Sequence, residues 1–392
     1  MSENLLTEAR EMQPELSRWR RCLHQYPELG TILPKTVAFV TGELDKMNIS
    51  YKVCEDSSNV IAQIGKGDKC FLLRSDMDGL PILEESGEEF AATNGCMHAC
   101  GHDMHAAILL GAACLLKKHE KELKGTVKLL FQSGEETFSG AKEAIEAGIL
   151  ENPKVDVAFA MHVSPNEENG RIQYGQYPMT SVYGFRITLH GKGTHGSTPE
   201  NGVDPINTGI HLYLAFQELI AREISANEEA VLTIGHFESG KAFNVIPEEA
   251  VLEGTLRTYK KEVRDYLIQR IEEVTKSVAM TYRTECKIEV LSDVPSFVCD
   301  MNFTEEILQS IHKLDSDIET LPTFHAMGSE DFALISQHVP TAYFFIGAGV
   351  ENKNEWVGHH NPKARFNEEC LSIASAIYAN AAIRWLDKHN CS

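Results

Sequence analysis

The fold is decided by three apolar runs, CFLLRSDMD (70–78), TVKLLFQSGEE (126–136) and VDVAFAMHV (155–163), which alternate with the helix-like segments HAAILLGAACLLKKHEKEL (105–123) and SGAKEAIEAGIL (139–150). This alternation predicts an α/β fold with a mixed, largely parallel sheet covered by helices on both faces. In such sheets the functional site lies at the carboxyl ends of the strands. Each run ends there in ionisable residues: Asp76 and Asp78, Glu135 and Glu136, and His162.

The pattern changes from about Gly184. Strand-like segments at 185–193, 230–239, 250–258 and 286–291 accompany helix-like segments at about 204–224 and 260–282. This order of elements is typical of a small ferredoxin-like α+β unit with an antiparallel sheet. After Ser296 the α/β pattern returns, with helices near 302–314 and 367–390, a helix opening at Ser329–Glu330 and a strand at 341–349. We therefore expect a discontinuous catalytic domain, 1–183 and 297–392, and an inserted domain, 184–296.

The charge and hydropathy of the chain argue against several classes of protein. The formal net charge is -21 over 392 residues, and no stripe of Lys and Arg interrupts it, so a nucleic-acid partner is not expected. No run of about 18–20 apolar residues predicts a membrane-spanning helix. The first 25 residues resemble an amphipathic helix rather than a secretory signal, and ten cysteines show no framework spacing. We expect a cytoplasmic protein with reduced thiols.

The segment MHACGHDMH (97–105) brings thiol, imidazole and carboxylate groups together at the start of a helix. These groups are the usual ligands of zinc and its first-row neighbours. Gly101 would let the backbone turn so that Cys100 and His102 point at one centre. The alternatives are a chance cluster in a polar helical turn, and a buried structural thiol at Cys100. Other roles are expected for the remaining residues: a helix cap for Asp103, and structural support for His98 and His105.

A second signal is the acidic pair Glu135–Glu136, which follows an apolar strand-like run. Adjacent residues that leave a strand point to opposite sides, so one carboxylate could bind a metal while the other addresses a bound water. Taken alone, such a pair is more often part of a solvated surface. Considered singly, His162 and His360 are more often structural or surface histidines, whereas Asp76 and Asp78 could be metal ligands, partners that orient a histidine, or turn residues before Pro81.

Eight motifs occur in order over nearly the whole chain. They are RSDMDGLPI (74–82), MHACGHDMHAA (97–107), LLFQSGEE (129–136), AMHV (160–163), HGKGTHGSTPENGVDPI (190–206), NVIPEEAVLEGTLRT (244–258), GSEDFA (328–333) and HHNPKARFNEE (359–369). In combination they resemble the aminoacylase/carboxypeptidase family of metallo-amidohydrolases, which includes hippurate hydrolases, N-acetyl-amino-acid deacetylases and auxin-conjugate hydrolases. The resemblance implies a metal-dependent hydrolase of an amide bond.

The resemblance also implies a centre of two divalent metal ions per subunit, for which zinc, manganese, nickel and cobalt are all compatible. Cys100 would take the place of the aspartate that often bridges the metals in the broader clan. Glu135 would be the general base, and Asp78 would orient a ligand. His360 is preferred over His359 because it directly precedes Asn-Pro, as in the family's His-x-Pro pattern. The implied ligands are Cys100, His102, Glu136, His162 and His360.

For the inserted domain, the resemblance implies a lid that also forms the interface of a homodimer. His195 would stabilise the oxyanion, within one chain or across the dimer, and Asn244 and Arg257 would bind the substrate carboxylate. The expected reaction is hydrolysis of small N-acyl-L-amino acids, with an acetyl or aromatic acyl group, by a metal-activated water. The alternative enzyme is a dipeptidase or carboxypeptidase of the same family. The alternative from another class is a silent, metal-stabilised scaffold, although the chain retains every implied ligand and base.

Overall fold

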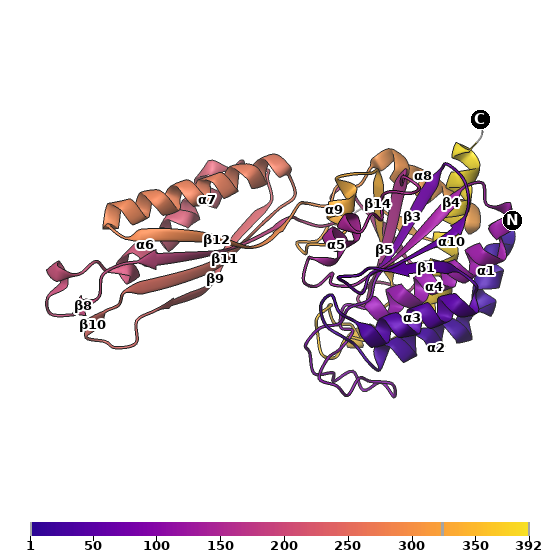
Figure 1. Ribbon diagram of the computed structural model, residues 1–392, viewed down its shortest axis with the longest axis horizontal. Coiled ribbons are helices and arrows are strands. Elements are labelled where there is room, and N and C mark those ends of the chain that lie inside the picture. The colour runs from indigo at the N-terminus through magenta and orange to yellow at the C-terminus, as the bar shows by residue number, and fades with distance from the viewer. Residues whose placement is uncertain (1, 323–324, 391–392) are drawn as a thin grey trace. The chain divides into compact units, whose positions relative to one another are not determined.

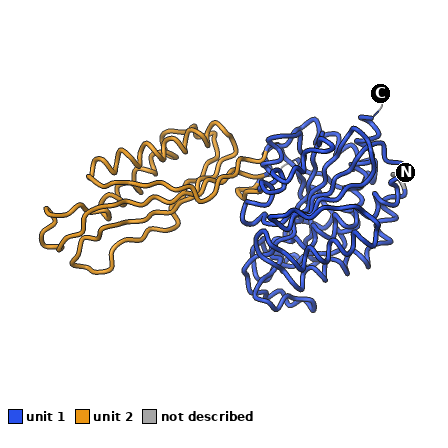
Figure 2. Tube along the Cα trace, viewed as in Figure 1, with its two compact units in different colours: residues 1–178, 298–325, 331–392 blue, residues 179–297, 326–330 orange. Residues whose placement is uncertain are grey.

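The computed structural model describes residues 2–322 and 325–390, and its chain divides into two compact units (Figure 2). Unit 1 consists of residues 1–178, 298–325 and 331–392, and unit 2 consists of residues 179–297 and 326–330. Unit 1 is therefore discontinuous in sequence. Unit 2 begins at 179 rather than at the expected 184, and it includes the segment 326–330, which the expected boundaries assign to the catalytic domain.

Unit 1 is built on an eight-stranded sheet (Figure 1). Its strands are β1 (Ser50–Val53), β2 (Val60–Gly65), β3 (Cys70–Asp76), β4 (Thr126–Gln132), β5 (Val157–Ser164), β6 (Ile172–Tyr174), β13 (Thr320–Leu321) and β14 (Thr341–Gly347). Their order is β1-β2-β4-β3-β5-β14-β6-β13. The central strands β4, β3, β5 and β14 are mutually parallel, whereas β1–β2, β2–β4 and β6–β14 are antiparallel. The prediction of a mixed, largely parallel sheet is confirmed.

The four central strands are buried along their whole length, as expected when both faces of a sheet are covered. Successive side chains of a strand point to opposite faces. On one face, Phe71, Val127 and Phe159 belong to the main hydrophobic core. The alternate positions of the same strands place buried polar groups on the other face: Arg74, Asp76, Gln132 and His162. These polar groups lie toward the carboxyl ends of the strands, where the functional site of such a sheet is expected.

The helices of unit 1 are α1 (Ser2–Glu11), α2 (Gln13–His24), α3 (Pro34–Lys46), α4 (His102–Lys118), α5 (Gly140–Glu146), α8 (Met301–Leu314), α9 (Ala333–Ser336) and α10 (Cys370–His389). The central helix is α4, which packs against α2, α10 and β3. It is buried over most of its length because its sequence is apolar on nearly all sides. The first turn of α4 is thereby fixed relative to the sheet.

Unit 2 has a four-stranded antiparallel sheet with the order β12-β7-β11-β9. Its elements are β7 (Val182–His190), β8 (Thr194–His195), α6 (Pro205–Glu218), β9 (Ala230–Ser239), β10 (Val245–Ile246), β11 (Glu249–Thr258), α7 (Lys261–Tyr282) and β12 (Glu285–Val294). Both helices pack with the sheet around a separate hydrophobic core that includes Phe185, Phe216 and Ile271. The short strands β8 and β10 form a second, two-stranded sheet. The expected ferredoxin-like order is present.

Two predicted helices differ from the structure. The N-terminal helix is interrupted at Met12, where α1 and α2 meet. The predicted helix opening at Ser329–Glu330 is wrong, because α9 begins only at Ala333. The preceding segment instead bonds within unit 2, where the carbonyl of Gly328 accepts a hydrogen bond from the backbone of Thr180 at 2.8 Å. Among the helices described, none is both long and apolar enough to cross a lipid bilayer.

Candidate metal centre

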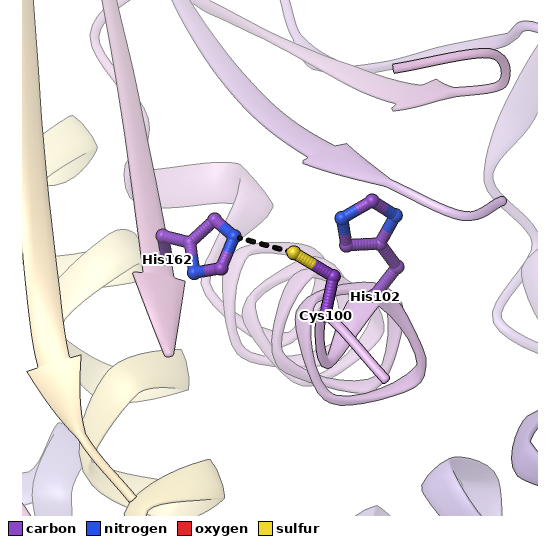
Figure 3. A group of neighbouring side chains, drawn as sticks. All are labelled: Cys100, His102 and His162. Carbon is purple, nitrogen blue, oxygen red and sulfur yellow. Dashed lines mark hydrogen bonds between the residues drawn. The ribbon is translucent and has the colours of Figure 1, made fainter. Parts of the chain in front are cut away.

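Two groups of three potential metal ligands in unit 1 share one residue, Cys100. It is joined by His102 and His162 in the first ligand group, and by Glu136 and His360 in the second ligand group. In each group the ligand atoms lie within 4.8 Å of one another. Figure 3 shows the first group, with the Cys100 sulfur between the two imidazoles and 3.4 Å from His162 Nε2. The Cys100 sulfur thus belongs to both candidate ligand groups.

The turn before α4 holds Cys100 and His102 together. Gly101 is the N-cap of the helix and has a φ of 89°, in the left-handed region that favours glycine. A Cβ at this position would lie 2.5 Å from Cγ2 of Val163 and 3.1 Å from the ring of Phe366. Both the conformation and the available space therefore require glycine.

Asp78 organises the carboxylate side of the centre. Its two oxygens accept hydrogen bonds from the backbone N–H groups of Glu135 at 3.2 Å and Glu136 at 3.1 Å. Its Oδ1 also lies 3.3 Å from Nδ1 of His102. The side chains of Glu135 and Glu136 both reach His102 Nε2, at 4.0 and 3.9 Å. One buried carboxylate thus orients the expected base and two expected ligands.

The two vicinal histidines have different surroundings. His360 Nε2 lies 3.2 Å from Glu136 Oε1, within the second ligand group. His359 Nε2 instead donates to the carbonyl of Val163 at 2.8 Å. The backbone of His360 has a φ of 59°, which costs a residue other than glycine about 1–3 kcal/mol and is typical of functional sites. His360 rather than His359 therefore belongs to a candidate ligand group.

The cluster contains a buried polar atom that a cation would satisfy. His102 Nε2 makes no hydrogen bond to any residue in the described part of the chain, and the nearest carboxylate oxygens lie 3.7 to 4.0 Å away. An unsatisfied buried polar atom costs about 1–3 kcal/mol. Thiolate, imidazole and carboxylate donors together suit a divalent first-row ion. The residues present therefore fit a metal.

Three of the five candidate ligands, Cys100, His102 and His360, have raised pKa values, whereas the pKa values of Glu136 and His162 are lowered. Burial raises the pKa of the Cys100 thiol, and the carboxylate of Glu136 raises it further. Hydrogen bonds to Cys100 and Glu136 raise the pKa of His360 to about 10. Burial lowers the pKa of His102, but Asp76, Asp78 and Cys100 together outweigh that effect and hold the pKa well above its usual value. Because a metal must displace the protons on the groups with raised pKa values, its affinity is expected to increase with pH.

A buried polar network lies behind the ligands. Asp76 accepts hydrogen bonds from His105 Nδ1 at 2.5 Å and from Arg74 at 2.8 Å. His105 Nε2 in turn accepts from the backbone N–H of Val163 at 2.9 Å, directly after the candidate ligand His162. Asp76 and His105 therefore support the backbone beside a candidate ligand.

Unit 2 carries the other three expected residues. His195 Nδ1 accepts hydrogen bonds from the backbone N–H of Ser197 at 3.1 Å and from its hydroxyl at 2.7 Å, so Nε2 carries the proton. Asn244 lies in the turn before β10, and its carbonyl accepts a hydrogen bond from the residue after His195. Arg257 on β11 is half-buried and donates to Ser329 Oγ at 2.5 Å. His195 and Asn244 are thus neighbours in the small β8–β10 sheet.

Asp103 does not cap α4. It lies inside the helix, and its buried Oδ2 contacts Arg20 Nε and His24 Nδ1, both at 2.8 Å. The motifs of the sequence do not reveal these two residues of α2. A signal is nevertheless present, because the buried face of α2 contains two charged residues in an apolar helical stripe. That face consists of Leu16, Trp19, Arg20, Leu23 and His24.

Comparisons with known proteins agree with this geometry. The profile of the peptidase family M20/M25/M40 matches residues 72–384. IAA-amino acid hydrolase ILR1-like 5 from Arabidopsis thaliana is 37% identical over 377 residues, covering 94% of this chain and 86% of its own length. N-acetyl-L-cysteine deacetylase from Bacillus subtilis (strain 168) is 34% identical over 382 residues, covering 96% and 90%. The crystal structure of the Bacillus subtilis YXEP protein, a dinuclear metal-binding peptidase from the M20 family, has 32% identity and a TM-score of 0.82, covering 96% of this chain and 99% of that one.

Proposed function

Because this chain belongs to peptidase family M20/M25/M40, whose members hydrolyse amide C–N bonds, we propose that it hydrolyses N-acyl-L-amino acids to a carboxylic acid and a free amino acid. The acyl group is acetyl or aromatic. The observation that carries the proposal is the pair of ligand groups that share Cys100, with Glu135 next to the ligand Glu136. Further support comes from the two relatives whose names specify an amino-acid conjugate and an N-acetylated amino acid.

The two ligand groups fit two divalent ions. One ion would be held by Cys100, His102 and His162, and the other by Cys100, Glu136 and His360. Such ions, when bound, lower the pKa of a water toward neutrality and polarise a carbonyl oxygen. The mixed donor set leaves zinc, manganese, nickel and cobalt as candidates.

Glu135 is the general base of the proposed reaction. Its carboxylate reaches the cluster, with Oε2 4.0 Å from His102 Nε2, and Asp78 fixes its backbone. We assign to it the removal of a proton from the attacking water and the delivery of that proton to the leaving amine. Only 6% of Glu135 is exposed, so bulk water has little access to the carboxylate.

His195 is the proposed donor to the oxyanion. Its Nδ1 accepts from Ser197, so the neutral ring presents an exposed Nε2–H that can donate to a developing negative charge. Removal of one such donor typically lowers the rate by about 10²–10³. The tautomer supports this role whether the residue acts within one chain or across a dimer.

Arg257 and Asn244 are the proposed binding residues for the substrate carboxylate. A protein with a net charge of -21 needs a local positive charge to hold an anionic substrate. The half-buried guanidinium of Arg257 can form two parallel hydrogen bonds with a carboxylate, and the Asn244 amide can add a third.

We further propose that two copies of the chain associate through unit 2. Strand β9 is ten residues long and forms one edge of the four-stranded sheet, where unpaired backbone groups can pair with another strand. Beside it, α6 exposes Ile210, Tyr213 and Leu214. A Cβ on Gly209 of α6 would lie 2.6 Å from the ring of Phe237 on β9, so the helix and the strand edge form one surface. This surface suits an isologous dimer.

Leu214→Asp is expected to convert the dimer to a monomer, because it places a charge in the apolar surface of α6. The measurement is molar mass by light scattering during size-exclusion chromatography. Met280→Asp is the matched control, because Met280 is also exposed but lies on α7, and it should leave the dimer intact. A monomeric wild-type protein would overturn the dimer proposal.

The reaction is tested with the purified chain and a panel of N-acetyl, N-benzoyl and phenylacetyl amino acids, supplemented with zinc, manganese or cobalt. We expect release of the amino acid that a chelator abolishes and added metal restores. The absence of chelator-sensitive release from every substrate would overturn the proposal.

The same panel distinguishes the two alternatives. Dipeptides with a free α-amino group should be poor substrates, and a preference for them would identify a dipeptidase or carboxypeptidase instead. A silent scaffold would bind metal but hydrolyse nothing.

A further inference from the structure

His24 is buried at the end of α2 between two buried carboxylates. Its Nδ1 lies 2.8 Å from Asp103 Oδ2, and its Nε2 lies 2.9 Å from Glu84 Oε1. All three side chains are at most 1% exposed. An imidazole donates from both ring nitrogens only when it is protonated. The ring is therefore a positive charge that bridges two negative charges in the interior.

On one side, His24 holds the start of α4. Asp103 directly follows the ligand His102, and its carboxylate contacts both His24 and Arg20. Arg20 also donates to Glu368, just before α10, at 3.0 Å. The turn that carries Cys100 and His102 is thus anchored to α2 and, through α2, to the start of α10.

On the other side, His24 holds the loop 84–92. The carboxylate of Glu84 closes this loop by accepting hydrogen bonds from the Ser86 hydroxyl and from the backbone N–H of Ala92. The ring of Phe90 packs edge-on against His24, with the ring centroids 5.3 Å apart. The guanidinium groups of Arg20 and Arg21 also lie over the Phe90 ring, 4.7 and 5.1 Å from its centroid, so the loop is attached to α2 through Glu84 and through Phe90.

The loop 84–92 also contacts the chain segment of the second ligand group. The backbone N–H of Glu85 donates to the carbonyl of Pro362 at 2.8 Å, two residues after His360. His360 itself lies 3.2 Å from Glu136. A continuous set of contacts therefore connects His24 to each of the two ligand groups.

We propose that His24 is a positioning residue that couples the two halves of the metal centre, through Asp103 on one side and through the loop 84–92 on the other. The inference rests on the proposed two-metal centre and not on its substrate. Loss of His24 leaves Asp103 paired with Arg20, whereas Glu84 has no other cationic partner among the described residues. The ion of the second ligand group should therefore be affected most.

The test is titration of the metal-free full chain with Co²⁺, followed by thiolate-to-cobalt absorption and by the metal content after dialysis. Wild type is expected to retain two ions. His24→Gln should bind the more weakly held ion at least about tenfold less tightly, a change typical of residues that support metal ligands. His360→Gln removes a ligand of the second ligand group and should show the same selective loss, which identifies the ion concerned.

His119→Gln is the matched control. His119 follows the other end of α4 and also lies between two carboxylates, Glu8 at 3.1 Å and Glu122 at 3.5 Å. It should keep both ions with wild-type affinity. If His24→Gln also keeps both ions with wild-type affinity, His24 does not position the centre.

Glu84→Gln keeps the inference testable if His24→Gln does not fold, because it leaves the contact between His24 and Asp103 intact. It should weaken the same ion, and circular dichroism of the metal-free variant shows whether it is folded. Retention of both ions at full affinity would overturn the inference. If wild type itself does not hold two ions, the two-metal centre fails instead, so the two failures are distinguishable.

Discussion

Single residues set the geometry of the metal centre, and Gly101 is the most constrained of them. Gly101→Ala places a Cβ 2.5 Å from Val163 and forces alanine to a φ of 89°. We expect loss of the bound metal and a decrease of about 1–3 kcal/mol in the free energy of unfolding of the metal-free protein. Metal analysis after dialysis and urea unfolding measure the two effects.

Gly148→Ala is the control for Gly101→Ala. Gly148 has a similar φ of 86°, but a Cβ there would meet no neighbouring atom of the described residues within 4 Å. It shares the conformational cost without the clash and should keep its metal. Full metal content in Gly101→Ala would contradict the requirement for glycine in the ligand turn.

Glu135 and Glu136 are adjacent, but their replacement should have different effects on activity and metal content. Glu135→Gln removes the proposed base and is expected to lower kcat by about 10²–10⁴ while the metal content stays unchanged. Glu136→Gln removes a proposed ligand and should lose metal as well as activity. Metal analysis and kinetics on the same preparations separate the two effects. Normal turnover in Glu135→Gln would remove this residue from its role.

His24 should make stability depend on pH. Burial lowers its pKa, but Asp103 and Glu84 together outweigh that effect and raise the pKa above the usual 6.5. The stabilisation is therefore complete below pH 6.5 and is lost as the pH rises through the pKa of the folded state. The difference in unfolding free energy between metal-free wild type and His24→Gln should therefore become smaller as the pH rises. A difference that does not vary with pH would contradict a charged His24.

At the scale of elements, the close packing of α4 against α2 and α10 depends on Gly111. A Cβ there would lie 2.3 Å from Ser375 Oγ and 2.6 Å from Leu16 Cδ2. Gly111→Val should lower the free energy of unfolding by about 1–3 kcal/mol, because the helices must separate. Gly42→Ala in α3 has open space around it and should be neutral or stabilising. Urea unfolding compares the two, and equal stability would argue against tight packing.

The elements that could be predicted from the sequence are those whose own residues indicate that they are buried. Strands β3, β4, β5 and β14 are buried on both faces and therefore appear as continuous apolar runs. The short strands β6 and β13, at one end of the sheet, have no such pattern. The helix predicted at Ser329–Glu330 begins only at Ala333, and the Asp331 carboxylate before it accepts hydrogen bonds from the Gln132 amide and the backbone N–H of Ala141 in α5, which are distant in sequence and give no local signal.

The candidate site residues were likewise predictable only where they belong to a recognisable sequence motif. Cys100 and His102 are recognisable because they are close in sequence and have the chemistry of ligands. His24 and Glu84 are 60 residues apart, and only the fold brings their side chains to 2.9 Å. Long-range pairs of this kind have no local signature, apart from a charged residue in the apolar stripe of α2.

At the scale of the whole molecule, metal should stabilise one unit and not the other. All five proposed ligands lie in unit 1. A ligand at a hundred times its dissociation constant stabilises the folded state by about 2.7 kcal/mol. Differential scanning calorimetry with and without a chelator should therefore shift one unfolding transition and leave the transition of unit 2 in place. An equal shift of both transitions would show that the units unfold together.

Because unit 1 is formed by segments before and after unit 2, the two units cannot be completed in the same order as they are begun during synthesis. A chain leaves the ribosome from its N-terminus, and domains generally fold as they emerge. The hydrophobic core of unit 2 lies within residues 183–288, so it can be complete before β14 and His360 have been synthesised. Until then β5 lacks its parallel neighbour β14. A stop codon between 298 and 340 would thus leave unit 2 with a complete core, the sheet of unit 1 without β14, and the second ligand group without His360.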